Sequence, residues 1–193
     1  MAEPSKEPDI PLSYVVLLSG THVTGKETLA MSLSKSLGCP WLAGEQAHTM
    51  AWSGARSQAK QGLNYAEVFG RIWFAKLQRL GLPSGAEAGC AALISCYATR
   101  KGVRDAIRAV MFANSIRVIF VVLQITPETL SGRTLGAEEP ALAERIMGEK
   151  IADIEEPLEE ELETDVIRVD STQDVDTLFV EIKDKIGGRL ATT

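Results

Sequence analysis

The sequence lacks three features that mark large classes of protein. It has no basic excess: 20 Lys and Arg face 26 Asp and Glu, giving a formal net charge of -6, whereas a general nucleic-acid binder presents a basic surface. It has no long apolar run either, because the longest, residues 116–125, is interrupted by Arg117 and Gln124 and is far shorter than the roughly 20 residues of a membrane helix. We therefore expect no nucleic-acid partner and no membrane partner.

Cysteine is scarce as well. Cys39, Cys90 and Cys96 are an odd number without metal-ligand spacing, which favours reduced thiols that pack as small hydrophobic groups. Residues 1–12 contain three prolines and three acidic residues but no apolar stretch, so this segment is interpreted as a flexible tail and not as a signal peptide. A chain with these properties is expected to be cytoplasmic.

What the sequence does contain is an alternation of strand and helix patterns. The chain is 193 residues long and 45% hydrophobic, which suits one domain with a substantial core. Apolar and β-branched runs predict strands at 14–19, 41–43, 91–95, 118–123 and 166–169. Apolar residues at helical spacing predict helices at 26–37, 45–80 with a break near Gly62, 100–113 and 175–186. Between the last two, a short helix follows Pro127, and a connection over 134–140 leads to another helix that runs through Ile151.

This alternation predicts an α/β fold. Parallel strands joined by helices form right-handed crossovers, so the helices cover both faces of the sheet. The first predicted strand is apolar throughout, as is usual for a strand buried on both faces. We expect a three-layer α/β/α sandwich around a five-stranded parallel sheet, in a single domain over residues 13–190.

A glycine-rich turn joins the first predicted strand to the first predicted helix. Residues 20–26, Gly-Thr-His-Val-Thr-Gly-Lys, match the first seven positions of the phosphate-binding motif G-x-x-x-x-G-K-[ST]. In such a loop the backbone N–H groups and the helix N-terminus bind phosphate oxygens, while the lysine neutralises the terminal phosphates. This context predicts a P-loop NTPase fold. The expected ATP-binding residues are Gly20, Thr21, His22, Val23, Thr24, Gly25, Lys26, Glu27 and Thr28.

The residue after the lysine departs from the motif. Ser or Thr normally occupies that position and ligates Mg2+, but this chain has Glu27, followed by Thr28. A shift of one residue turns a helical side chain by about 100°, so Thr28 does not replace the missing hydroxyl. Two outcomes stay open. Either Glu27 supplies a carboxylate oxygen to Mg2+, or its charge opposes the phosphates, an effect of about 4 kcal/mol at about 4 Å and an effective dielectric near 20.

Beyond the loop, the chain resembles the small gluconokinases, which belong to the shikimate-kinase-like and nucleoside-monophosphate-kinase-like (NMP-kinase-like) branch of P-loop kinases. The likeness covers about residues 14–186. Residues 44–48, Gly-Glu-Gln-Ala-His, are similar to the family's Gly-Asp-x-x-His, and residues 90–93, Cys-Ala-Ala-Leu, to its Cys-Ser-Ala-Leu, with Tyr97 in step. Residues 154–157, Ile-Glu-Glu-Pro, resemble the Leu-Glu-Glu-Pro that follows the family's lid, and residues 165–170 resemble its closing strand.

The resemblance implies that the protein transfers the γ-phosphoryl group of ATP, with Mg2+, to a hydroxyl of a sugar acid, gluconate first. It implies a small lid around residues 131–150 and, because the family is often dimeric, a homodimer. The catalytic residues that it implies are Lys26, Glu45, Arg133 and Arg145. The implied substrate-binding residues are Glu45, His48, Arg71 and Tyr97, and the implied metal ligands are Glu27 and Glu45.

Other positions depart from the family pattern. Ala91 replaces its serine, Ile94 replaces the lysine that follows, and residues 131–136, Ser-Gly-Arg-Thr-Leu-Gly, replace its basic lid. Of the family's gluconate-holding Arg-Pro-Trp-Leu stretch, Arg71 and Trp73 are the plausible remnants. Phosphoryl transfer depends mostly on positioning and electrostatic stabilisation. The alternative function is therefore a catalytically weakened nucleotide-binding or interaction protein without kinase turnover.

Two further features are less specific. Trp52, Tyr65 and Trp73 are candidates for stacking on a base, which would suit a nucleotide or a shikimate-like acceptor, although aromatics at these spacings usually belong to a core. The stretch 155–165 holds seven carboxylates and is interpreted as a solvated helical face or turn.

Overall fold

The protein has an α/β fold built on one five-stranded parallel sheet. The computed structural model describes residues 13–21, 23–44, 65–82, 89–134, 148, 151 and 163–191. The strands follow the order β2-β3-β1-β4-β5 across the sheet, and every pair of neighbours is parallel. Their bounds are β1 Tyr14–Gly20, β2 Trp41–Ala43, β3 Cys90–Cys96, β4 Arg117–Gln124 and β5 Val166–Asp170. The predicted parallel sheet is confirmed.

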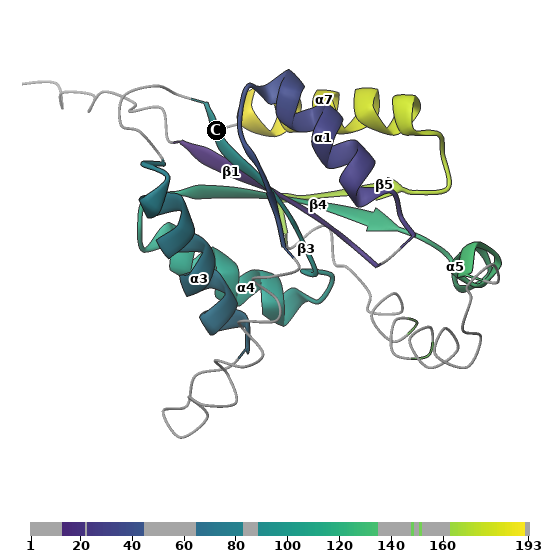
Figure 1. Ribbon diagram of the computed structural model, residues 1–193, viewed down its shortest axis with the longest axis horizontal. Helices are drawn as coiled ribbons and strands as arrows, with labels where there is room; N and C mark the ends of the chain where they lie inside the picture. Colours follow the sequence, from purple (N-terminus) through teal and green to yellow (C-terminus); the bar gives the residue numbers. More distant parts are fainter. Residues whose placement is uncertain are drawn as a thin grey trace, which may run out of the picture.

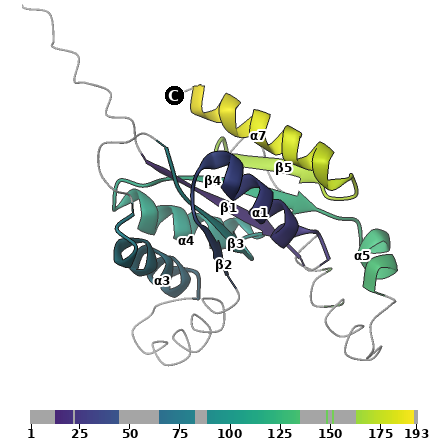
Figure 2. The same cartoon turned by 45° about the horizontal axis from the view of Figure 1, so that its top comes forward.

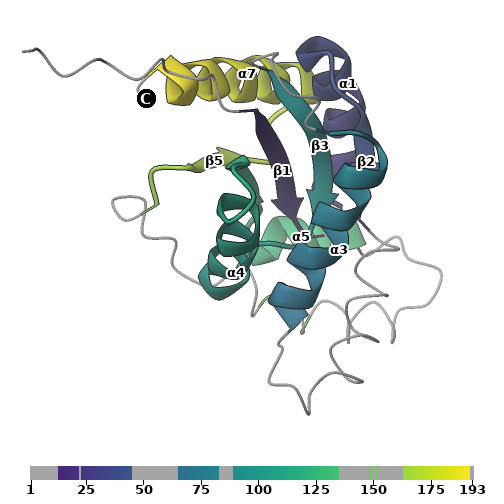
Figure 3. The same ribbon diagram turned by 90° about the vertical axis from the view of Figure 1, so that its left-hand side faces the viewer.

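Helices cover both faces of this sheet and make three layers. α1, Lys26–Leu37, and α7, Val175–Ala191, lie on one face, whereas α3, Tyr65–Arg79, and α4, Lys101–Phe112, lie on the other (Figure 1). The view turned by 90° shows β1 and β3 running between these two helix pairs (Figure 3). α5, Pro127–Thr134, follows β4 and lies beyond the end of that strand (Figure 2).

β1 occupies the centre of the sheet because its side chains are apolar on both faces. All seven of its residues are buried. Val15 and Leu17 belong to the core cluster that includes side chains of α3 and α4. Val16 and Leu18 belong to the cluster that includes side chains of α1 and α7. Successive residues of a strand point to opposite faces, so one apolar strand serves both cores.

Most predicted boundaries agree closely with the observed ones, and α7 is the exception. α1 has the predicted bounds and ends at Gly38, whose φ of 65° is left-handed. The sequence predicts that the last helix ends at Ile186, ahead of two glycines, but α7 continues to Ala191. Leu190 packs against the cluster shared with α1. This tertiary contact outweighs the low helix propensity of Gly187 and Gly188.

The end of the acidic stretch is paired with arginines. Glu163 is 4% exposed, and its carboxylate accepts hydrogen bonds from Arg104 Nε at 3.0 Å and Nη2 at 2.5 Å. Asp165 accepts two hydrogen bonds from Arg108, at 2.7 and 2.8 Å. The prediction of a solvated face is wrong for Glu163 and Asp165, because α4 brings two guanidinium groups to them.

Several predicted features lie outside the described residues. They are the tail, residues 1–12, the part of the predicted helix before Tyr65, and the lid beyond Thr134 apart from residue 148. The division of the chain into a tail and one domain with a lid therefore stays a prediction. Within the described ranges, no helix combines the length and the apolar character needed to cross a membrane.

Candidate functional site

A cavity lies at the carboxyl ends of β2 and β3, beside the loop that follows β1. Its volume is about 360 Å³. The loop and the first turn of α1 form one wall, and the ends of β2 and β3 form the other. The lining residues are Val23, Thr24, Gly25, Lys26, Glu27, Thr28, Ala43, Gly44, Ser95, Cys96 and Tyr97. Open parallel α/β sheets bind ligands outside the carboxyl ends of their strands, so this cavity is the candidate site.

The glycine-rich loop curls through two left-handed residues. Val23 has a φ of 57° and Gly25 a φ of 78°. Thr24 lies between them, is buried, and donates its hydroxyl to the carbonyl of Thr21 at 2.8 Å. Left-handed residues that alternate with right-handed ones turn successive N–H groups to one side, which makes a concave anion site. The loop therefore has a backbone shape suited to phosphate oxygens.

Gly20 permits close packing where β1 enters the loop. A Cβ atom at this position would lie 3.0 Å from Leu123 Cβ and 3.0 Å from Thr24 Oγ1. Leu123 is the register partner of Gly20 on β4. A side chain here would push Thr24 or the neighbouring strand aside, so glycine holds the start of the loop against the sheet.

The ammonium group of Lys26 lies inside the loop. Its Nζ donates hydrogen bonds to the carbonyls of Gly20 at 2.7 Å and Thr21 at 2.6 Å. The same Nζ lies 4.8 Å from the centroid of the Tyr97 ring, which is a cation–π distance. The structure thus brings together Lys26 and Tyr97, which lie 71 positions apart in the sequence.

α1 begins at the cavity with a glycine at its N-cap position. Gly25 has no side chain that could accept a hydrogen bond from the first N–H groups of the helix. The first N–H groups of a helix have no acceptor within the helix and carry partial positive charge. Glu27 and Thr28 are both exposed on this first turn and line the cavity. The carboxylate of Glu27 therefore lies in the region that the helix dipole makes attractive to an anion.

Arg133 is bound to the backbone beside the loop. Its Nη1 donates to the Val23 carbonyl at 2.9 Å, and its Nη2 donates to the Ser171 carbonyl at 3.0 Å. Val23 belongs to the glycine-rich loop and Ser171 directly follows β5. One guanidinium at the end of α5 therefore joins two of the loops at the carboxyl edge of the sheet and adds positive charge next to the glycine-rich loop.

Sequence reasoning found only part of the second wall of the cavity: it included Gly44 and Tyr97 but gave no role there to Ala43, Ser95 and Cys96. A Cβ atom at Gly44 would lie 1.9 Å from the carbonyl oxygen of Ser95, so the end of β2 approaches β3 too closely for any side chain. Trp41 Nε1 donates to Ser95 Oγ at 3.2 Å. Burial raises the pKa of the Cys96 thiol to about 12, although Lys26 acts in the opposite direction. The sequence held one signal that could have located this wall: the carboxyl ends of the predicted parallel strands meet at one edge of the sheet.

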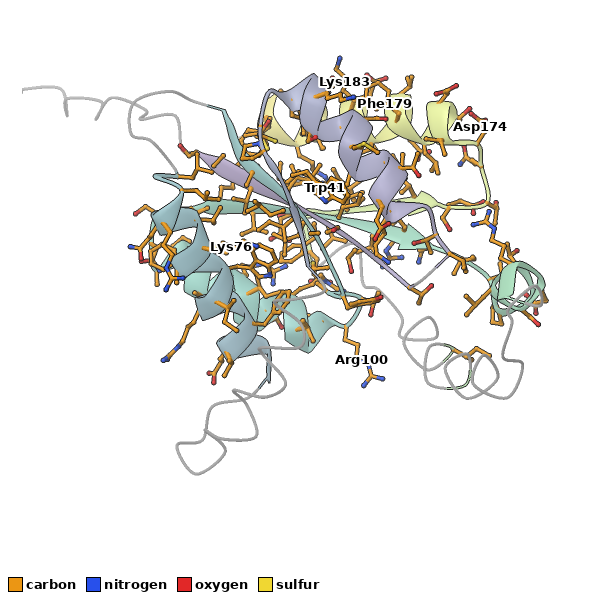
Figure 4. All side chains as sticks on the ribbon, viewed as in Figure 1. Trp41, Lys76, Arg100, Asp174, Phe179 and Lys183 are labelled. Carbon is orange, nitrogen blue, oxygen red and sulfur yellow. The ribbon has the colours of Figure 1, made fainter. Side chains whose placement is uncertain are left out.

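Two predicted residues lie away from the cavity. Arg71 is exposed on α3 and does not line the cavity. Trp73 is fully buried in the core cluster of α3 and α4, where its ring makes an edge contact with Phe69 at 6.0 Å. Lys76 projects from the same helix, α3 (Figure 4). Its Nζ lies 5.0 Å from the Trp73 ring centroid. Trp73 is therefore a core residue, as the sequence favoured for aromatics at this spacing, and the alternative that it stacks on a base or holds gluconate is wrong.

The other predicted residues cannot be placed relative to the cavity, since they lie outside the described ranges. They are His22, Glu45, His48, Trp52 and Arg145, together with the side chain of Tyr65. Glu45 directly follows Gly44 in the sequence.

The described residues offer Mg2+ a small set of ligands. In the part of the chain that the structure describes, no three His, Cys, Asp or Glu side chains are grouped so as to hold a metal. The cavity lining supplies the carboxylate of Glu27 and the hydroxyl oxygen of Thr24, whose proton is donated to the Thr21 carbonyl. Mg2+ at nucleotide sites commonly takes one or two carboxylates together with phosphate oxygens and waters. These residues therefore fit an ion carried by a nucleotide better than an ion held by protein alone.

Comparison with known proteins gives a structural match without a sequence match. No protein-family model and no curated protein matches the chain. Its structure is similar to that of a gluconokinase from Sinorhizobium meliloti 1021, with a TM-score of 0.64, 16% identity, and coverage of 94% of this chain and 95% of that chain. It is also similar to an unliganded sugar kinase from Janibacter sp. HTCC2649, with a TM-score of 0.61, 20% identity, and coverage of 91% and 95%.

The chain has a kinase-like P-loop fold. The match extends over more than nine-tenths of each chain in both comparisons, so it includes the helices around the sheet as well as the sheet itself. At 16% and 20% identity the likeness establishes the fold, whereas the chemistry has to be argued from the residues of the site.

Proposed function

We propose that this protein is an ATP-dependent small-molecule kinase that phosphorylates a sugar acid, with gluconate as the first candidate. The observation that carries the proposal is the position of Lys26. Its ammonium lies inside a loop with two left-handed residues, at the start of a 12-residue helix whose N-cap residue is glycine. The backbone N–H groups of the loop, the positive end of the helix dipole and the ammonium then attract negative charge to the same place, which favours binding of a polyphosphate. The gluconokinase and sugar kinase neighbours support the choice of acceptor class.

In this proposal the loop binds the phosphates of ATP and Lys26 neutralises their outer oxygens. The phosphate oxygens would compete with the carbonyls of Gly20 and Thr21 for the Lys26 ammonium, since both carbonyls now accept from it. A charged acceptor forms a stronger hydrogen bond with an ammonium than a neutral carbonyl does. Binding of ATP should therefore turn Lys26 from its own loop toward the nucleotide, with the Tyr97 ring beside it.

The remaining roles follow the family pattern and are part of the same proposal. Mg2+, when bound with ATP, would neutralise the developing charge on the phosphoryl oxygens. Glu27 would contribute a carboxylate oxygen to it. Glu45 would orient or deprotonate the attacking hydroxyl of the acceptor, and Arg133 and Arg145 would stabilise the transferred group. The homodimer and the cytoplasmic location expected from the sequence belong to this proposal as well.

A second candidate is a nucleotide-binding protein of the same fold without turnover. Two observations favour it. The carboxylate of Glu27 is exposed among the lining residues, where it opposes phosphate charge unless a metal ion intervenes. Ile94, at the position where the gluconokinase pattern has lysine, is fully buried in the core between the sheet and α3 and α4, so that position supplies no cation to the cavity.

The two candidates are separated by measuring ATP binding and turnover on the same preparation of the full chain. Calorimetry with Mg2+ and ATP gives the affinity, and a coupled assay gives turnover across a panel of sugar acids, nucleosides and shikimate. Phosphorylated gluconate supports the first candidate, ATP binding without product on any acceptor supports the second, and absence of ATP binding overturns both.

Lys26→Ala and Lys35→Ala form a matched pair for the same assays. Lys35 is exposed in the last turn of α1, at the end of the helix away from the cavity. Removal of Lys26 should weaken ATP binding by at least an order of magnitude, because a hydrogen bond to a charged group contributes about 1.5–3 kcal/mol. Lys35→Ala should match the parent chain. Equal affinity of the parent chain and Lys26→Ala would contradict the proposed role.

A further inference from the structure

Two of the three cysteines lie close together at the amino-terminal edge of the sheet, at the opposite end of the strands from the candidate site. Cys39 follows Gly38 at the end of α1, and Cys90 is the first residue of β3. Trp41 pairs with Leu93, and the Pro40 carbonyl accepts a hydrogen bond from the Leu93 N–H at 3.0 Å. This register sets the segment just before β2, which contains Cys39, alongside the first residues of β3.

Both side chains enter the same layer of the fold. Cys39 is buried within the cluster between the sheet and α1 and α7, and the half-buried Cys90 packs against that cluster. The Cys90 thiol donates to the Ala92 carbonyl at 3.4 Å, and the interaction between the two cysteines shifts the pKa of both. Tyr14, the register partner of Cys90 on β1, lies in the same cluster as Cys39, and both cysteines add to the effect of burial that raises the Tyr14 pKa to about 12. The register, the shared cluster and the common neighbour therefore all place the two sulfur atoms together.

The surroundings of the two thiols differ. The interaction with Cys90, with help from the N–H groups of Cys39 and Leu93, lowers the pKa of Cys39 even though burial acts to raise it. The same interaction and burial raise the pKa of Cys90. A thiolate, and not a thiol, is the nucleophile in sulfur chemistry. Cys39 is thus the attacking group of the pair and Cys90 the partner that keeps its proton longer.

We propose that Cys39 and Cys90 form a reversible intramolecular disulfide when the protein meets hydrogen peroxide, so that this pair is an oxidative modification site outside the candidate active site. The Cys39 thiolate attacks one peroxide oxygen: an S–O bond forms, the O–O bond breaks, and the hydroxide that leaves becomes water on protonation. The Cys90 sulfur then attacks the sulfur of the Cys39 sulfenic acid. An S–S bond forms, the S–O bond breaks, and the departing hydroxide takes the Cys90 proton. Two thiols lose two electrons and two protons, and one peroxide becomes two waters.

The bridge joins the end of α1 to the start of β3. α1 begins at Lys26, inside the loop of the candidate site, and Cys39 follows its other end. β3 ends at Cys96, which lines the cavity. The disulfide would therefore link the two elements that lead to opposite walls of the cavity. Formation of the bridge does not depend on the proposed kinase function, because no nucleotide takes part in it.

The test uses the full chain, reduced, freed of reductant and then treated with hydrogen peroxide. We expect the intact mass to fall by two hydrogens and the maleimide-reactive thiols of the denatured protein to fall from three to one. A peptide map made without reductant should join the Cys39 peptide to the Cys90 peptide. Treatment with a dithiol should restore all three thiols, as expected of a disulfide.

Three variants sharpen the result. Cys39→Ser and Cys90→Ser should each abolish the intramolecular bridge, whereas Cys96→Ala, the matched control at the far end of β3, should keep it. The proposal is overturned if oxidised parent protein keeps three reactive thiols, if the map joins Cys96 to either partner, or if the products are solely disulfides between chains. If a serine variant fails to fold, the peptide map of the parent protein decides by itself.

Discussion

Arg104 and Glu163 form a two-point ion pair inside the protein, between α4 and the residues that precede β5. Arg104 is 0% exposed and Glu163 4%. The same guanidinium donates to the carbonyl of Ala98 at 3.2 Å and to that of Thr99, while the Ala98 N–H donates to Ser19 Oγ at 2.7 Å. Tyr97, whose ring faces Lys26, directly precedes this stretch. The ion pair thus holds the backbone that carries one wall of the cavity.

Breaking this ion pair should destabilise the fold strongly. Arg104→Met leaves the buried Glu163 carboxylate with Arg108, at 3.1 Å, in place of two arginines, and removes the donor to two backbone carbonyls. We expect the free energy of unfolding to fall by about 3 kcal/mol, the lower end of the range for breaking a buried ion pair. Urea denaturation measures the change. Lys101→Ala is the control, because Lys101 pairs with Asp105 at 2.7 Å at the surface, with 44% and 46% of the side chains exposed, and such pairs add little. Similar midpoints for the two variants would contradict the expectation.

The same carboxylate should make stability depend on pH in the acid range. Burial acts to raise the pKa of Glu163, but hydrogen bonds and charges from Arg104 and Arg108 outweigh it, so the pKa lies below the ordinary 4.5. A carboxyl whose pKa is lowered on folding stabilises the protein above its unfolded pKa, and this stabilisation is lost as the pH falls through the folded pKa. We expect the free energy of unfolding to decrease below about pH 4.5. Glu163→Gln should be less stable than the parent chain at neutral pH, and its free energy of unfolding should decrease less steeply as the pH falls. An unchanged dependence on pH would show that Glu163 is not its source.

Val23 should be a source of strain in the loop. Its φ of 57° is left-handed, which costs an L-residue about 1–2 kcal/mol, whereas glycine adopts it freely at an entropic cost of about 0.5–1 kcal/mol. Val23→Gly should therefore stabilise the protein by several tenths of a kcal/mol up to about 1 kcal/mol. Val180→Gly, at an exposed position within α7, should destabilise it instead. A lower unfolding midpoint for Val23→Gly would show that the contacts of the valine side chain stabilise the protein by more than its left-handed backbone conformation destabilises it.

A methyl group at Gly44 should disturb the cavity. The added Cβ would meet the Ser95 carbonyl at 1.9 Å, so β2 or β3 has to move, and overpacking of this kind typically costs about 1–3 kcal/mol. Gly102→Ala is the control, because a Cβ there meets nothing within 4 Å and alanine favours the helix. Thermal unfolding should give a lower midpoint for Gly44→Ala and an equal or higher one for Gly102→Ala. The opposite order would mean that the edge of the sheet tolerates displacement.

Glu27→Gln tests the charge that replaces the motif hydroxyl while keeping the size of the side chain. Glu27 is exposed, so a water-like dielectric applies, and removing one like charge at about 4 Å is worth about 1 kcal/mol, or about fivefold in affinity. We expect tighter ATP binding by calorimetry in the absence of Mg2+. With Mg2+ present, a loss of affinity in the variant would instead assign the carboxylate to the metal. Identical affinities under both conditions would exclude both roles.

Local sequence pattern was sufficient for the strands, for α1 and for the glycine-rich loop. β1 is apolar along its whole length, and a strand of that kind belongs in the interior of a parallel sheet. The loop is defined by glycines and a lysine within seven consecutive residues, so its conformation depends mainly on neighbours in the chain. The close approach of Gly44 to Ser95 was not predicted, because it depends on the pairing of β2 with β3.

Contacts between residues far apart in the sequence could not be predicted from local pattern. Glu163 lies 59 positions from Arg104, and an acidic run viewed alone is indistinguishable from a solvated one. Trp73 has the residue type of a base-stacking platform, yet it lies in the core because α3 packs against α4 and the sheet. The end of α7 was misplaced for a related reason, since Leu190 is held by a tertiary contact.

Taken by itself, the amino-acid order determined the succession of the described elements and the position of the glycine-rich loop. Hydrophobic periodicity, glycines and helix-start signals act between residues a few positions apart. Only the tertiary structure decided which side chains surround that loop, which acidic groups are buried with arginine, and which cysteines meet. Those outcomes depend on strand order and helix packing, which bring together residues separated by tens of positions and change the dielectric around their charges.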